Sequence, residues 1–160
     1  MEFSSRKTAN FFLLNPFLIF SILILITSLR ILALMYSPLG LSVDEAQYWD
    51  WSNKLDLGYF SKPPLIAWLI SFSTLIFGNE EWAVRLFSPI IHLFISIVLW
   101  SCSNSIYGPK AGSLTAIIWI TLPATSLGSF LISTDTPLLF FWSLGLLSLI
   151  KIIKNGNLFW

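Results

Sequence analysis

The chain has 160 residues, of which 56% are hydrophobic and only 11% charged, and its formal net charge is +1. A soluble domain carries about a quarter charged residues, so this composition excludes an ordinary soluble domain and indicates an integral membrane protein. The near-neutral charge and the lack of a basic run exclude a nucleic-acid-binding role.

The first predicted element is a membrane-spanning helix over residues 16–37. This segment is apolar for long enough to cross a bilayer, which takes about 20 residues. The polar residues Arg6 and Lys7 precede it. Arg30 lies inside the predicted helix, and two interpretations stay open: the side chain extends to the membrane interface, or it faces a polar cavity.

A polar stretch follows over residues 43–64, inside a first loop that we place at 39–85. It carries four carboxylates and five aromatic residues, whereas most of the chain is apolar. Residues 63–78 are apolar over about 15 residues, which is short for a span and predicts a helix beside the membrane. Together with a helix over the preceding polar stretch, this segment gives a juxtamembrane helical hairpin.

Three further spans are predicted, at residues 88–106, 111–131 and 136–153. We expect Pro123 to kink the second of these. His92 stands alone in an apolar segment, and we expect it to make a hydrogen bond between packed helices rather than to bind a ligand. The predicted fold is an all-α polytopic membrane protein, one domain over residues 1–160 with about four transmembrane helices.

The placement of charges predicts the orientation, provided that residues 63–78 do not cross the membrane. One side then receives five basic residues against the single acid Glu2: Arg6, Lys7, Lys110, Lys151 and Lys154. The other side receives seven acids: Asp44, Glu45, Asp50, Asp56, Glu80, Glu81 and Asp135. By the positive-inside rule, we expect a cytoplasmic N-terminus in the inner (plasma) membrane, with the acidic loops facing outward.

Acids and aromatic rings lie close together in sequence near the start of the first loop. A helix here places five residues on one face: Asp44, Gln47, Tyr48, Trp51 and Leu55. Carboxylates beside aromatic rings are typical of sugar-binding sites, and a carboxylate that reaches the proton of a nucleophile can act as a general base. The alternative is that Asp44 and Glu45 are solvated charges that cap the start of the helix.

Five other charged residues have a structural interpretation, and for two of them a functional interpretation stays open as well. Lys62 precedes two prolines that suit a helix start, where it can bind a lipid phosphate or serve as an ordinary interface lysine. Asp135 either caps the helix that follows it or faces inward to bind polar groups. Glu80, Glu81 and Arg85 are expected to form a surface ion pair.

Five segments, in this order, resemble the N-terminal part of the bacterial family 39 glycosyltransferases. These are membrane enzymes of the GT-C fold, related to protein O-mannosyltransferases and to the lipid A aminoarabinose transferase. The segments are DEAQYWDWS at 44–52, LDLGYFSKPPLIAWL at 55–69, FGNEEWAVRLFSP at 77–89, YGPKAG at 107–112 and STDTPLLFFW at 133–142. Family members are longer and have more spans, so we expect this chain to correspond to the N-terminal part only.

The resemblance implies transfer of a sugar from a polyprenyl-phosphate donor to a hydroxyl of a lipid, glycan or protein acceptor, on the outer face of the membrane and usually with inversion. It places the catalytic acids of the family on Asp44 and Glu45, with Asp44 as the base or metal-proximal acid and Glu45 in support. It places the donor-phosphate contact on Lys62 and a cavity acid on Asp135. The residue before Lys62 is Ser61, where aminoarabinose-transferase-like members carry an acid.

Two tyrosines of the first loop, Tyr48 and Tyr59, complete the candidate substrate-binding residues. No cofactor is indicated with certainty, and a divalent metal ion stays open. The alternative function is a truncated or non-catalytic membrane scaffold that binds lipid or a partner.

Overall fold

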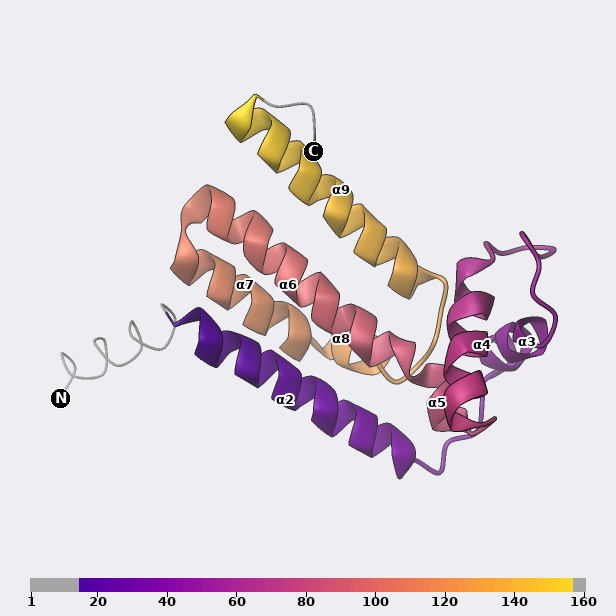
Figure 1. The fold of residues 1–160 in the computed structure, drawn as a ribbon. Helices are drawn as coiled ribbons and strands as arrows, with labels where there is room; N and C mark the ends of the chain where they lie inside the picture. Colours follow the sequence, from indigo (N-terminus) through magenta and orange to yellow (C-terminus); the bar gives the residue numbers. More distant parts are fainter. Residues whose placement is uncertain (1–14, 157–160) are drawn as a thin grey trace.

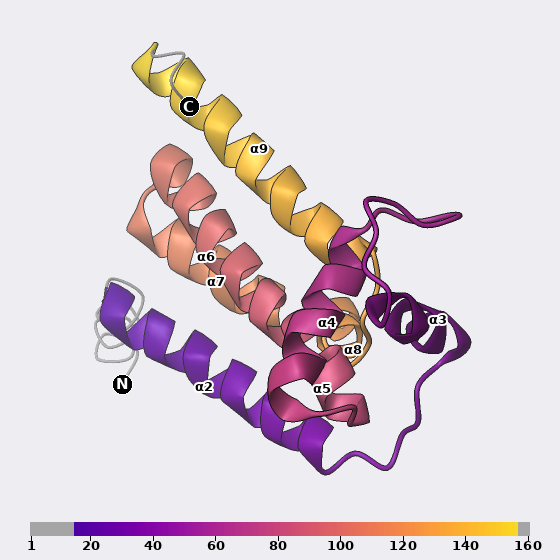
Figure 2. The ribbon, with the colours of Figure 1, turned by 45° about the vertical axis from the view of Figure 1, so that its right-hand side comes forward.

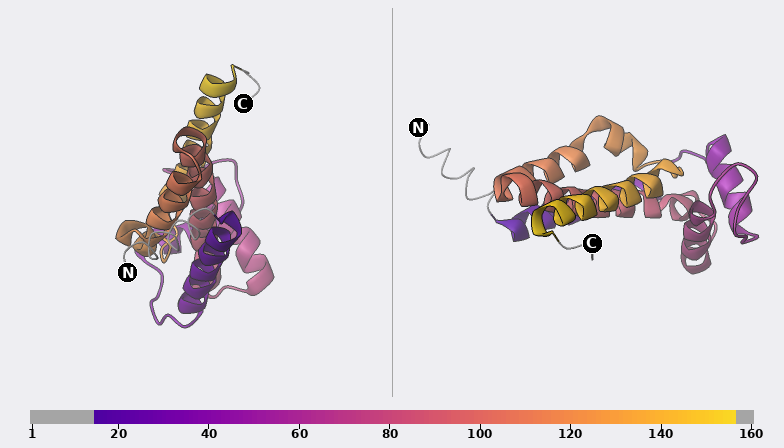
Figure 3. Two further views of the ribbon diagram at one scale, coloured as in Figure 1. Left: turned by 90° about the vertical axis from the view of Figure 1, so that its left-hand side faces the viewer. Right: turned by 90° about the horizontal axis from the view of Figure 1, so that it is seen from above.

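The computed structural model describes residues 15–156, and its regular secondary structure within this range is helical throughout. Three long helices and one shorter helix lie alongside one another: α2 (Pro16–Met35), α6 (Phe87–Tyr107), α9 (Asp135–Asn155) and α7 (Pro109–Thr121) (Figure 1). Three helices gather at one end of this group: α3 (Val43–Ser52), α4 (Leu65–Phe77) and α5 (Glu81–Arg85) (Figures 1 and 3). Arg6 and Lys7, which contribute to the predicted orientation, lie outside the described residues.

Three helical segments are long and apolar enough to cross a membrane: Pro16–Met35, Glu81–Tyr107 and Asp135–Lys154. This finding confirms the predicted all-α membrane fold. Helix α4 has 13 residues, so it is only about 20 Å long, against the roughly 30 Å of a hydrocarbon core. Because α4 packs against α3, the helical pair predicted in the first loop is also present (Figure 2).

The segment predicted as a span over residues 111–131 is not one kinked helix. Helix α7 ends at Thr121, Leu122 is extended with ψ of 135°, and α8 (Pro123–Gly128) begins immediately afterwards. Proline lacks the N–H that would continue the helix, and its ring clashes with the preceding turn. The expected kink is therefore a break, and the fourth membrane span stays a prediction.

Helices α6 and α7 are joined by a turn at Gly108, whose φ of +88° suits glycine. Farther along α7, a Cβ on Gly112 would lie 2.8 Å from the backbone oxygen of Trp100 and 2.9 Å from Cβ of Asn104. Beside this contact, the hydroxyls of Ser103 and Thr115 are 2.7 Å apart. Small residues and hydroxyl contacts of this kind let membrane helices approach closely.

The basic residues at the ends of the long helices lie away from the loop region. Lys110 is in the first turn of α7, and the ammonium of Lys154 near the end of α9 donates to the backbone oxygen of Ser105. Figure 1 shows this end of the helices opposite α3, α4 and α5. The separation of charge on which the predicted orientation depends is therefore present for these residues.

The close approach at Gly112 gives the first prediction. Replacing Gly112 with Ala forces α7 away from the backbone of α6, so we expect the midpoint of thermal unfolding in detergent to fall by several degrees. The matched control is Gly145→Ala in α9, where no atom lies within 4 Å of the added Cβ. Alanine also favours a helix by roughly 0.5–1 kcal/mol over glycine, so this control is expected to unfold at an equal or higher temperature. Equal midpoints for the two variants would contradict the tight contact.

Candidate functional site

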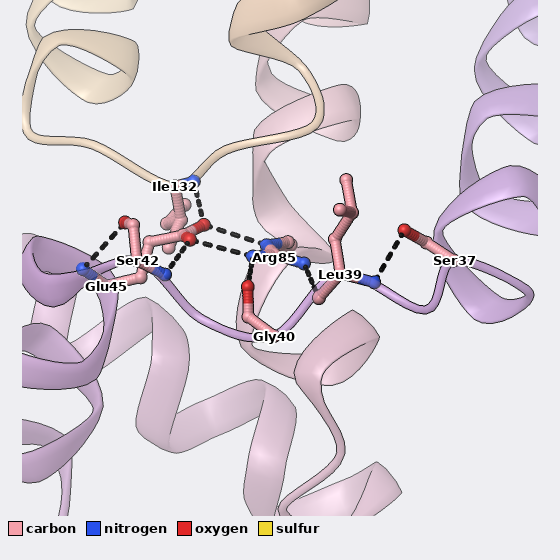
Figure 4. A network of polar contacts seen from close by, with 7 residues as sticks. All are labelled: Ser37, Leu39, Gly40, Ser42, Glu45, Arg85 and Ile132. Atoms are coloured by element: carbon pink, nitrogen blue, oxygen red, sulfur yellow. Dashed lines mark hydrogen bonds and ion pairs between the residues drawn. The ribbon is translucent and has the colours of Figure 1, made fainter.

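The loop region is built around a buried ion pair between Glu45 and Arg85. Arg85 donates from Nε to Glu45 Oε1 and from Nη2 to Glu45 Oε2, and both distances are 2.8 Å (Figure 4). The side chains are only 1% and 4% exposed. A paired arginine–carboxylate contact of this geometry is among the strongest charge-assisted interactions in proteins.

Local sequence places Glu45 for this role. Ser42 is the N-cap of α3 and Glu45 is the third residue of the helix, so the two form a capping box. The backbone N–H of Ser42 donates to Glu45 Oε2 at 2.9 Å, and the backbone N–H of Glu45 donates to the Ser42 hydroxyl at 3.4 Å. The capping interpretation therefore applies to Glu45, but the carboxylate is buried and not solvated.

The ion pair joins segments that are distant in sequence. The backbone N–H of Ile132, in the loop before α9, donates to Glu45 Oε1 at 3.0 Å. Arg85 also donates to the carbonyl oxygens of Leu39 and Gly40, each at 2.8 Å. The start of α3, the end of α5 and the loop before α9 are thus tied together at one point.

The predicted surface ion pair of Glu80, Glu81 and Arg85 is wrong. Arg85 is 3% exposed and its carboxylate partner is Glu45. Burial by itself raises the pKa of Glu45, but the hydrogen bonds from Arg85, Ser42 and Ile132 and the charge of Arg85 together lower it below its ordinary value. Glu45 is therefore an anion in the folded protein at neutral pH.

Asp44 lies next to this pair but on a different face of α3. Asp44 and Gln47 are exposed, whereas Glu45, Tyr48 and Ser52 face the protein. Leu55 does not belong to the predicted helical face, because α3 ends at Ser52. The four hydrogen bonds of Glu45 favour the supporting role for this residue and leave Asp44 as the accessible carboxylate.

The two candidate tyrosines lie within the framework of the loop. Tyr48 is 2% exposed and packs with Ile66, Ile70 and other buried side chains. The ring of Tyr59 stacks on Trp51, with centroids 4.8 Å apart and planes inclined by 7°. The Tyr59 hydroxyl lies 3.0 Å from the carbonyl oxygens of Trp51 and Lys54, to either of which it can donate. These contacts favour a structural role, and substrate binding by the tyrosines stays a prediction.

An apolar crevice of about 190 Å³ lies between the starts of α4 and α9, and its lining contains the chain neighbours of Lys62 and Asp135 but not these two residues. Its lining includes Pro63, which follows Lys62, and Thr134, which precedes Asp135. Lys62 is half-buried and Asp135 is exposed. The N-cap of α9 is Thr134, with no side-chain cap, so Asp135 does not cap this helix as the first interpretation supposed.

A metal site is not apparent in the part of the chain that the structure describes. Within residues 15–156, no three His, Cys, Asp or Glu side chains lie close enough together to hold a metal ion.

Removing the carboxylate charge tests the ion pair. In Glu45→Gln, Arg85 keeps its buried charge and loses its anionic partner, which costs about 3–5 kcal/mol when one member of a buried pair is removed. We expect a lower midpoint of thermal unfolding in detergent and faster proteolysis of the loop region. Asp44→Asn, one residue away and exposed, is the control and is expected to unfold like the wild type.

The lowered pKa of Glu45 predicts loss of stability in acid. The folded-state pKa lies below the ordinary value of 4.5, so the stabilisation is complete above that pH and is lost as the pH falls through the folded-state pKa. The unfolding midpoint measured between pH 7 and pH 3 should therefore fall more steeply for the wild type than for Glu45→Gln. Parallel curves for the two proteins would assign the acid sensitivity to other groups.

Comparison with known proteins identifies the family. The family model described as dolichyl-phosphate-mannose-protein mannosyltransferase matches residues 61–160. A lipid A galacturonosyltransferase of Rhizobium johnstonii is 43% identical over 120 residues, which are 74% of this chain and 25% of that protein. An undecaprenyl phosphate-alpha-4-amino-4-deoxy-L-arabinose arabinosyl transferase of Wigglesworthia glossinidia brevipalpis is 29% identical over 83 residues, 52% of this chain and 15% of that protein.

The chain thus spans a quarter or less of the length of these curated relatives. No solved structure gives a significant match. Because the family model covers well over half of the chain, from Ser61 to the last residue, the chain belongs to the dolichyl-phosphate-mannose-protein mannosyltransferase family of membrane glycosyltransferases.

Proposed function

We propose that the protein transfers a sugar from a polyprenyl-phosphate donor to a hydroxyl of a lipid, glycan or protein acceptor, with inversion, at the outward face of the inner membrane. The observation that carries this proposal is the joining of the first loop to the loop before α9 through Glu45 and Ile132. Asp44 is the chain neighbour of Glu45 and Asp135 is three residues after Ile132, so this contact supports a site that uses both exposed carboxylates.

The crevice suits a donor with a hydrocarbon chain. Its lining is almost entirely apolar: Pro63, Leu65, Ile66, Thr134, Pro137, Leu138 and Phe141. Lys62 directly precedes Pro63 of this lining, and in the proposal its ammonium neutralises a phosphate whose isoprenoid chain lies against these side chains. The relative from Wigglesworthia has undecaprenyl phosphate in its name, which agrees with a donor of this kind.

The transfer itself needs a base and a stabilised leaving group. Asp44 removes the proton of the acceptor hydroxyl while the hydroxyl oxygen attacks the anomeric carbon of the donor sugar. The bond between that carbon and the phosphate oxygen breaks, and the polyprenyl phosphate leaves with the bonding electrons, its charge balanced by Lys62. Glu45 holds α3 in place throughout, since its own lone pairs are engaged by Arg85, Ser42 and Ile132.

The names of the two relatives specify sugars that differ in charge. A galacturonosyl group carries a carboxylate, whereas a 4-amino-4-deoxy-arabinosyl group carries an amine. The family assignment by itself therefore leaves the class of sugar open.

Loss of the base is the direct test of function. In the full-length protein, Asp44→Asn should lower the rate of sugar transfer by about 10²–10⁴-fold, the usual contribution of a positioned general base, and leave the unfolding midpoint unchanged. The measurement uses membranes that contain the protein, incubated with polyprenyl-phosphate sugars, and follows product on lipid, glycan and protein.

Asp50→Asn is the matched control, because Asp50 is an exposed carboxylate of the same helix. Its transfer rate should equal that of the wild type. Full activity in Asp44→Asn would remove Asp44 from catalysis, and absence of transfer by the wild type from every donor would favour the scaffold interpretation.

A further inference from the structure

The membrane helices enclose a group of polar side chains at the break between α7 and α8. Arg30 of α2 donates from Nη2 to the backbone oxygen of Ile120 and, at 2.8 Å, to the hydroxyl of Ser126. The break leaves the Ile120 carbonyl without a helical donor, and Arg30 supplies one. Of the two interpretations of Arg30, the one facing the protein interior is therefore correct. The helix-to-helix hydrogen bond predicted for His92 is not found among the described residues, and its Nδ1 is buried.

An accessible polar depression lies in the loop region, where the ends of the packed helices α3 and α4 meet (Figure 2). Its volume is about 370 Å³, within the range of small-molecule sites. Two amides, three hydroxyls and one apolar side chain line this α3–α4 depression: Ser52, Asn53, Ser71, Thr74, Leu75 and Asn79. Because none of these side chains is charged, the lining offers no counter-charge to a phosphate, a carboxylate or an amine.

Local sequence brings the two amides of the lining together. Asn53 is the C-cap of α3. At the end of α4, Gly78 has a φ of +83°, a conformation that suits glycine and turns the chain after the helix. The next residue is Asn79, which lies beside α3 because its Oδ1 accepts from the indole Nε1 of Trp49 at 3.1 Å.

Trp49 determines which atom of each amide is left for a ligand. An indole nitrogen only donates, so the Asn79 atom facing it is the oxygen, and the Asn79 amino group is left over. The amino group of Asn53 donates to the backbone oxygen of Trp49 at 3.0 Å, which leaves Asn53 Oδ1. Among the described residues, neither the Asn79 amino group nor Asn53 Oδ1 has a hydrogen-bond partner. The α3–α4 depression therefore retains one oriented donor and one oriented acceptor.

The hydroxyls of the lining extend this pattern. Ser52 donates to the backbone oxygen of Trp49 at 2.6 Å, and Thr74 donates to the preceding turn of α4 at 2.9 Å, so both oxygens can still accept. The Ser71 hydroxyl has no hydrogen-bond partner in the part of the chain that the structure describes, so it can donate or accept. Leu75 is 84% exposed and adds an apolar surface. Uncharged donors and acceptors beside an apolar surface match a sugar ring, whose edges carry hydroxyls and whose faces carry C–H groups.

We propose that the α3–α4 depression binds an uncharged sugar, carried by a soluble glycan or by a glycolipid. The Asn79 amino group donates to a sugar hydroxyl, Asn53 Oδ1 accepts from another, and Leu75 packs on a C–H face of the ring. The depression is separate from the proposed base: Asp44 is the second residue of α3 and Ser52 the last, about 12 Å apart along the helix axis. The inference thus goes beyond the proposed function and does not depend on transfer.

Binding of small sugars tests the proposal directly. Saturation-transfer NMR on the full-length protein in detergent would compare methyl galactoside, glycerol and inorganic phosphate. We expect the galactoside to bind about tenfold more tightly than glycerol, the gain from one or two further hydrogen bonds between uncharged groups. Equal affinities for the galactoside and glycerol, or displacement of the galactoside by phosphate, would overturn the proposal.

A galactolipid in mixed detergent micelles presents the same ring and distinguishes the two sources. If the galactolipid displaces methyl galactoside at lower concentration than free galactose does, the sugar is that of a glycolipid. The opposite order assigns a soluble glycan. Failure of both to displace the galactoside would contradict a sugar site.

Ser71→Ala locates the site without disturbing the fold. The exchange removes a hydroxyl that has no partner among the described residues, so the unfolding midpoint should not fall, whereas galactoside binding should weaken several-fold. Ser21→Ala is the matched control, because Ser21 is an exposed serine of α2 whose hydroxyl donates to its own helix. Equal galactoside binding by the two variants would contradict the assigned depression.

Two further variants separate the donor from the residue that positions it. Asn79→Ala removes the free amino group, so galactoside binding should fall by about tenfold. Trp49→Phe removes only the hydrogen bond that holds this amide, so it should weaken binding less than Asn79→Ala does. Wild-type binding by Asn79→Ala would overturn the role of the amide. Asp44→Asn should bind the galactoside like the wild type, so failure of the catalytic proposal and failure of this one are distinguishable.

Discussion

The contact between Glu45 and Arg85 is the constraint on which the arrangement of the loop region depends. Moving both charges away from water is expensive, and the cost is offset only when each lone pair and each N–H has a partner. Here Glu45 has Arg85, Ser42 and Ile132, and Arg85 has in addition the carbonyls of Leu39 and Gly40. Since these partners come from three segments, their positions are determined together.

This constraint separates two neighbouring carboxylates into different roles. Glu45 is immobilised and satisfied inside the protein, while Asp44 faces outward one residue earlier on the same helix. A site that transfers a proton needs an accessible acid on a rigid support, because small displacements of the base reduce the rate strongly. In the proposed mechanism, the buried pair is the rigid support and Asp44 is the accessible acid.

The break between α7 and α8 creates a second polar region by a different mechanism. A membrane interior offers no water to a carbonyl that loses its helical donor, so the protein has to provide a donor. Arg30 does so for Ile120 and also donates to the Ser126 hydroxyl.

The sequence by itself determined the helical membrane class, the short α4, the capping of α3 and the segregation of lysines from acids, because apolar length, helix caps and net charge are local properties. The tertiary structure decided the partner of Arg85, the inward direction of Arg30 and the burial of Tyr48, since each depends on residues far along the chain. The pattern around Arg85 suggests a surface ion pair with Glu81, and only the packing of α3 and α5 against α4 directs the guanidinium to Glu45, 40 positions earlier. Pro123 predicts that the helix is disturbed. Whether the helix bends or breaks there depends on Arg30 of α2, which donates to the Ile120 carbonyl and which no local pattern reveals.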